Sequence, residues 1–183
     1  MTSALPRSVL TGLPTIVLPA LAAGVWWLAT SALGWQGFVP GAALVSAALA
    51  AAHDITTHRI PDRLVLLAAC PMVVAVVVNS DPVRLGSAFA IGAFAMAGPL
   101  LALHLAAPAF IGWGDVKLAS VLGSALAVID VRLGVAALAL ASGATLIAAL
   151  LSRCSALPFA PGLVGGSAAL LAAASTAALE LPR

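Results

Sequence analysis

The short polar stretch GWGDVK, at residues 112–117, lies between two long apolar segments of the chain. It brings together a carboxylate, Asp115, an ammonium, Lys117, and two glycines, Gly112 and Gly114. Only 8% of the 183 residues are charged, so two charges at this place need a partner or a function. The rest of the sequence decides where this stretch lies and what it faces.

Composition identifies the class of protein. Of all residues 63% are hydrophobic and the mean hydropathy is +1.17, whereas roughly a quarter of the residues of a soluble domain are charged. Runs of Ala, Leu and Val without the alternating pattern of a barrel strand indicate helices. The sequence has no basic run, which argues against a nucleic-acid partner. We therefore predict an all-α integral membrane protein in the lipid bilayer, a polytopic bundle of about seven transmembrane helices.

The spans are read from apolar runs and turn residues. Residues 8–52 contain no charge, a run long enough for two spans, with a turn expected at Gly34, Gly37 and Pro40. We divide the single domain into residues 1–44, the N-terminal span and the start of the second, and 45–183, a six-helix core. The expected spans lie near 13–33, 39–54, 64–79, 84–105, 114–129, 133–152 and 161–180.

The fifth span fixes the position of the opening stretch. The uncharged run 118–129 would give a helix of about 18 Å, against roughly 30 Å of hydrocarbon. A spanning helix must therefore begin near Gly114, which places Asp115 and Lys117 at the start of a membrane helix.

The basic residues predict the topology. More of them fall on the N-terminal side of the membrane than on the other, so we expect a cytoplasmic N-terminus. Asp54, after the second span, then shares the cytoplasmic face with Asp115. The two sets are Arg7, Arg59, Arg63, Lys117 and Arg153 on the N-terminal side, and Arg84, Arg132 and Arg183 opposite.

Two carboxylates at one membrane face can act as an acid–base pair. When they lie close together they share a proton, so one can activate a water while the other protonates the leaving group. Because a helix dipole favours an anion at the N-terminus, we expect Asp115 to ionise more readily than Asp54. Each aspartate taken alone is also consistent with a helix cap or a solvated loop residue.

A family resemblance rests on these residues. The GxGDxK pattern at 112–117 follows Asp54 and the sequence Arg59-Ile60-Pro61, and this combination resembles the type IV prepilin peptidase family of GxGD membrane aspartic proteases. The resemblance implies that Asp54 and Asp115 are catalytic and that the neighbouring motif residues form the active site.

Further positions support the resemblance, with some departures. The sequence PFAP at 158–161 is similar to the family's late Pro-Phe-Gly-Pro element, although Ala160 replaces its glycine. Asp62 stands where the family usually has Asn. Longer members carry an N-terminal methyltransferase region with paired CxxC motifs, and this sequence contains no CxxC pair. The resemblance therefore implies the short form, with peptidase activity only.

The implied function is removal of the leader peptide from prepilins, pseudopilins or Flp/Tad-type pilins. It would take place at the cytoplasmic face of a prokaryotic cell (inner) membrane, without cofactor or metal. Two other classes stay open: a small proton-coupled transporter, in which buried carboxylates are also expected, and a non-catalytic membrane subunit of a pilus or secretion assembly.

Overall fold

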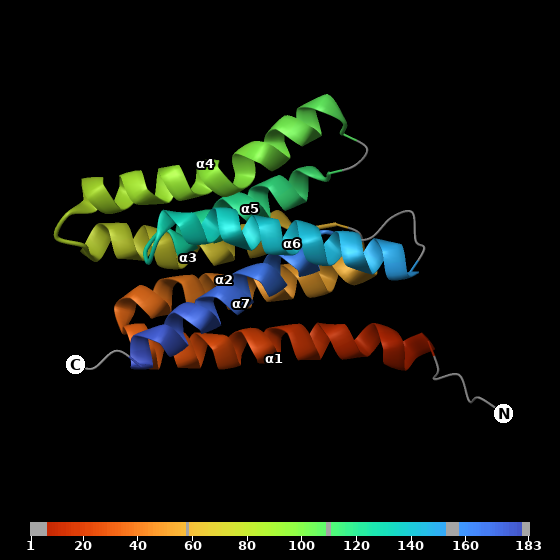
Figure 1. Cartoon of the computed structure of the whole chain (residues 1–183), viewed down its shortest axis with the longest axis horizontal. Coiled ribbons are helices and arrows are strands. Elements are labelled where there is room, and N and C mark those ends of the chain that lie inside the picture. Colours follow the sequence, from red (N-terminus) through yellow and green to blue (C-terminus); the bar gives the residue numbers. More distant parts are fainter. Residues whose placement is uncertain (1–6, 58, 109–110, 153–157, 181–183) are drawn as a thin grey trace.

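The computed structural model describes residues 7–57, 59–108, 111–152 and 158–180. Within these ranges every regular element is a helix, which confirms the all-α part of the prediction (Figure 1). The helices are α1 (Arg7–Leu33), α2 (Trp35–Thr57), α3 (Asp62–Val78), α4 (Pro82–Ala106), α5 (Trp113–Leu126), α6 (Val131–Ser152) and α7 (Ala160–Glu180).

Five of these helices, α1, α2, α4, α6 and α7, are long and apolar enough to cross a membrane. The other two are shorter: α3 has 17 residues and α5 has 14. The start of α5 at Trp113 agrees with the early start expected from the sequence, but the helix ends at Leu126 and not near residue 129. At 1.5 Å per residue it is about 21 Å long. A count of seven complete spans stays a prediction.

The turn between α1 and α2 is tighter than expected. Gly34 alone reverses the chain, with a positive φ of 61° that glycine adopts without strain. Gly37 and Pro40 were predicted to belong to this turn, which is wrong: both lie inside α2 and are buried. A Cβ on Gly37 would overlap the carbonyl oxygen of Ala29 on α1, so this glycine permits the close crossing of the two helices.

Helix α2 forms the centre of the bundle. In its apolar window 67% of the residues are buried, compared with 11% to 28% in the other four long helices. It contacts α1, α3, α5 and α7. The buried face of α2 is rich in alanine and glycine, which allows its neighbours to approach closely. Asp54 in the last turn of α2 is therefore buried, whereas Thr56 and Thr57 in the same turn are exposed.

The helices run back and forth along one common axis (Figure 1). As a result, the C-terminal ends of α2 and α4 and the N-terminal ends of α3 and α5 lie at the same end of the molecule (Figure 1). Helices α4 and α5 cross at Gly92 and Gly123, where a Cβ on either glycine would overlap the backbone of the other helix. This close crossing holds α5 in the bundle, with its first turn beside the end of α2.

Candidate active site

The first carboxylate lies near the C-terminal end of α2. Asp54 is 8% exposed, although aspartate is rarely this buried. The neighbouring His53 is exposed, and its Nδ1 lies 3.1 Å from the carbonyl oxygen of Arg59, which suits an N–H donated by the ring. This bond ties the end of α2 to the segment that leads into α3.

The second carboxylate lies in the first turn of α5, as predicted. Gly112 precedes the helix, and its N–H donates to Asp115 Oδ2 at 3.3 Å. This is half of a capping box, because glycine has no side chain with which to return the bond. The other oxygen, Asp115 Oδ1, is buried and has no hydrogen-bond partner among the described residues. One donor therefore fixes the carboxylate, while the hydrogen-bonding capacity of the other oxygen is unused among the described residues.

The segment before α5 is held by a residue that the sequence analysis did not assign to the site. His104, in the last turn of α4, has its Nδ1 2.7 Å from the carbonyl oxygen of Ile111. Its ring also contacts that of Trp113, with 5.4 Å between ring centres. His104 thus fixes the approach to Asp115, in the same way that His53 fixes the approach to α3. In the sequence, the position of His104 shortly before Pro108 was a feature that could have indicated this role.

The two motifs contact each other at Gly114 and Ile60. A Cβ placed on Gly114 would lie 2.9 Å from the Cβ of Ile60 and 3.3 Å from two further carbons of that side chain. Real Cβ atoms do not approach so closely, so this position requires glycine unless Ile60 moves. The second glycine of GxGD therefore has a packing role, which is to let α5 lie against the segment between α2 and α3.

These residues surround one pocket of about 340 Å³. Both aspartates line it, and their carboxylates are close enough for their charges to interact. The structure therefore brings together Asp54 and Asp115, which are 61 positions apart in the sequence. Pro61 is not part of the lining. The lining residues are Asp54, Arg59, Ile60, Asp62, Gly112, Trp113, Gly114, Asp115 and Lys117. We call this the acid pocket.

Lys117 has a different partner from those expected. From the sequence alone Lys117 could pair with Asp115, bind a substrate carboxylate or extend to water. In the structure its Nζ lies 2.7 Å from Asp62 Oδ1. The side chains are 35% and 71% exposed, respectively, so water screens this ion pair. The pair joins the first turn of α3 to α5 at the rim of the acid pocket. Asp62 therefore belongs to the site, although the sequence analysis noted it only as a departure from the family pattern.

Other predicted features lie away from the acid pocket. Phe159 packs against the core at the start of α7, so the PFAP element supports the bundle at this point. Cys70 is an exposed free thiol on α3. Within the described residues, no group of three or more His, Cys, Asp and Glu side chains could hold a metal ion. His58, Arg153, Cys154 and Arg183 lie outside the described residues.

The structure thus has the features of a helical membrane protein with two acidic side chains in one pocket. A comparison with protein-family models then matches the chain to the type IV leader peptidase family over residues 41–161. The match includes both aspartates and covers more than half of the chain. The chain belongs to this family, which makes it a membrane protease with prepilin-like substrates. Comparisons with curated proteins and with solved structures returned no match.

Proposed function

We propose that this protein is an aspartic endopeptidase that removes the leader peptide from type IV pilin-like precursors: prepilins, pseudopilins or Flp/Tad-type pilins. One observation carries the proposal: Asp54 and Asp115 line the same pocket at one end of the bundle. Family membership supports protease activity in general. The aspartic mechanism and the residues that perform it are the parts that we add.

In the proposed reaction the two carboxylates share one proton. The ionised carboxylate takes a proton from a water as the water oxygen attacks the carbonyl carbon of the scissile peptide bond. The protonated carboxyl donates a hydrogen bond to the oxygen that becomes negatively charged. The C–N bond then breaks, and the leaving nitrogen receives the proton. Asp115 Oδ1, which has no partner among the described residues, suits the water, whereas Oδ2 is held by Gly112.

We also propose that the acid pocket faces the cytoplasm of a prokaryotic cell and that the protein lies in the inner membrane. Arg59, Arg63 and Lys117 are at the end of the bundle that carries the pocket, and Arg84 and Arg132 are at the opposite end. An excess of basic residues is typical of the cytoplasmic side. The excess of basic residues expected from the sequence also counted Arg153, which lies outside the described residues. A reporter fused after α4, at the level of the pocket, and tested for cytoplasmic activity would check this orientation.

The position of the acids also bears on the transporter alternative. A proton-coupled transporter is expected to hold its carboxylates near the middle of the membrane. Asp54 and Asp115 instead lie in the last turn of one helix and the first turn of another. This arrangement supports hydrolysis at the membrane edge, where a peptide bond is accessible to water.

The test is co-expression with candidate precursors, followed by gel mobility to detect leader removal. Asp54→Asn and Asp115→Asn preserve side-chain shape and remove the acid function, so each should abolish cleavage. Asp81→Asn is the matched control, because Asp81 lies at the opposite end and caps α4 through an oxygen that asparagine retains. Cleavage that survives in both active-site variants would refute the carboxylate pair.

A further inference from the structure

The acid pocket continues into an apolar groove along α5. Trp113 and Lys117 line both the acid pocket and a neighbouring hollow of about 390 Å³ between α4 and α5. Ser120, one turn further along α5, lines this hollow and also the next one, of about 380 Å³, between α3, α4 and α5. We call these two hollows together the α5 groove. It forms a continuous path from the carboxylates along α5.

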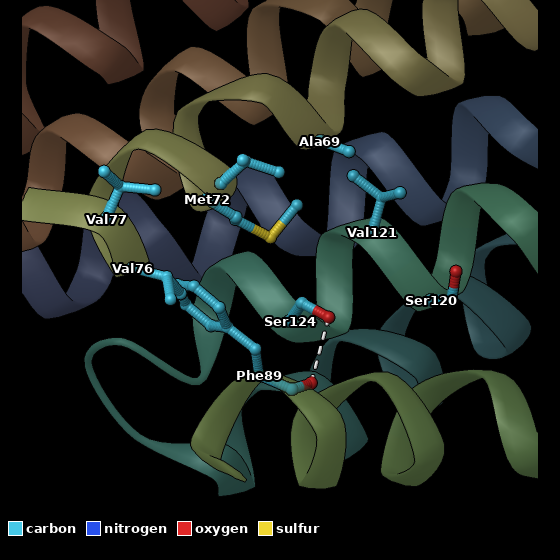
Figure 2. A pocket seen from close by; sticks show the side chains of 9 residues that line it. Ala69, Met72, Val76, Val77, Phe89, Ser120, Val121 and Ser124 are labelled. Atoms are coloured by element: carbon cyan, nitrogen blue, oxygen red, sulfur yellow. Dashed lines mark hydrogen bonds between the residues drawn. The ribbon is translucent and has the colours of Figure 1, made fainter. Parts of the chain in front are cut away.

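Figure 2 shows the far part of the α5 groove. Met72 and Val76 project from α3, and the ring of Phe89 extends from α4 toward Val76 (Figure 2). Along α5 the groove is lined by Trp113, Val116, Lys117 and Val121, and between them by the small side chains of Ser120 and Ser124. Their hydroxyls donate to the carbonyl oxygens of Lys117 at 2.7 Å and Phe89 at 2.9 Å, so these donors are already used. The groove is therefore largely apolar, and its two serine hydroxyls are already hydrogen-bonded.

At the two serines a helix in the groove can approach α5 closely, because small residues let two helical backbones come together. From Asp115 to Ser124 the groove extends about 14 Å along α5, which corresponds to roughly nine residues of a helix lying beside it. At its rims Val73 is 62% exposed and Phe94 is 77% exposed. In the bilayer such side chains need an apolar cover, which a lipid chain or an apolar helix can supply. Only a helix could also extend past Asp115 and bring a peptide bond into the acid pocket.

We propose that the α5 groove binds the apolar transmembrane helix of the precursor and so places the adjoining peptide bond in the acid pocket. This inference rests on the proposed function and adds the surface that selects the substrate. The continuity of the groove with the carboxylates favours a substrate helix over a lipid chain or a second copy of this protein, since neither of these needs to reach the acid pocket.

Two neighbouring valines on α3 provide the test. Val73 lines the α5 groove, whereas Val74 faces a separate apolar hollow toward α1 and α2; their exposed fractions are 62% and 59%. Val73→Trp should fill the groove and lower kcat/KM for a purified precursor by roughly tenfold or more, mainly through KM. Val74→Trp should leave kcat/KM within about twofold of wild type. Melting in detergent would verify that both variants fold.

Photo-crosslinking tests the occupant without relying on cleavage. A benzophenone amino acid at position 73 in the Asp115→Asn background should link to the helix of the precursor, and one at position 74 should not. Equal cleavage by the two tryptophan variants would overturn the proposal that the α5 groove binds the precursor. A crosslink from position 73 only to lipid or to a second copy of the protein would overturn it as well. If the wild-type protein cleaves no precursor while position 73 still links to one, the proposed function fails and the groove stands.

Discussion

Replacement of Gly114 by alanine tests how the two halves of the acid pocket fit together. The added Cβ would lie 2.9 Å from the Cβ of Ile60, which is a branching atom and cannot move by rotating a side chain. Overpacking of this kind costs typically about 1–3 kcal/mol. Alanine recovers up to about 1 kcal/mol through its higher helix propensity. The net loss of stability should therefore lie between about 0 and 3 kcal/mol, and the variant should fold.

The effect on activity should be larger than the effect on stability. To relieve the contact, either the segment at Ile60 or the first turn of α5 must move, and either shift changes the separation of Asp54 and Asp115. A displacement of about 1 Å in a catalytic group can cost on the order of a hundredfold in rate. We therefore expect Gly114→Ala to lower the rate of precursor cleavage by roughly ten- to a hundredfold.

The assay is a cleavage time course with purified protein and precursor, with thermal unfolding measured in the same detergent. Gly86→Ala is the matched control, since a Cβ on this helical glycine meets no atom within 4 Å. It should cleave at the wild-type rate and unfold at the same temperature or slightly higher. Wild-type cleavage by a folded Gly114→Ala variant would refute the proposed fit between Ile60 and the GxGD turn.

Three further predictions follow from other contacts. Lys117→Met should reduce the free energy of unfolding by less than about 1 kcal/mol, because the pair with Asp62 is partly exposed; a larger loss in denaturant melts would mean that the pair is not screened. Gly123→Ala should lower the unfolding temperature by overlap with the backbone of α4, with Gly86→Ala again as control, and unchanged melting would contradict the close crossing. His104→Ala should slow cleavage, because it removes the hydrogen bond to the carbonyl oxygen of Ile111 that holds the segment before α5. His104→Gln retains an N–H donor and should recover part of the cleavage rate. Equal cleavage rates in the two variants would contradict this role of the hydrogen bond.

Much of the helical arrangement could be predicted from the sequence because the constraint is simple. A chain with so few charges must bury its backbone polar groups in helices, and its rare polar residues then mark the helix ends. The expected limits of α6 and α7, 133–152 and 161–180, agree with the structure to within two residues at each end. The position of Asp115 followed from the length of one apolar run.

The turn at Gly34 shows where this reasoning failed. A glycine or proline in an apolar run can end a helix or can allow another helix to approach, and the sequence does not distinguish the two. Gly37 and Pro40 were read as turn residues, whereas Gly37 serves the crossing of α1 and α2. The end of α5 was predicted near residue 129, whereas the helix ends at Leu126. The reason is related: a helix can end before the uncharged run that contains it does.

Contacts between elements distant in the sequence were also beyond prediction. The sequence offered Asp115 as a partner of Lys117 because the two are neighbours along the chain, yet the lysine pairs with Asp62 on another helix. The place of His104 depends on the path of the connection between α4 and α5, which no local pattern specifies. The expectation that Asp115 ionises more readily than Asp54 stays a prediction.

The central claim is that Asp54 and Asp115 together cleave the precursor. Its most direct test uses purified protein in lipid vesicles with one purified precursor, and mass spectrometry to identify the products. The wild-type protein and Asp81→Asn should release an intact leader, whereas Asp54→Asn and Asp115→Asn should release none. Release of the same leader by either of the last two variants, at a rate near that of the wild type, would contradict it.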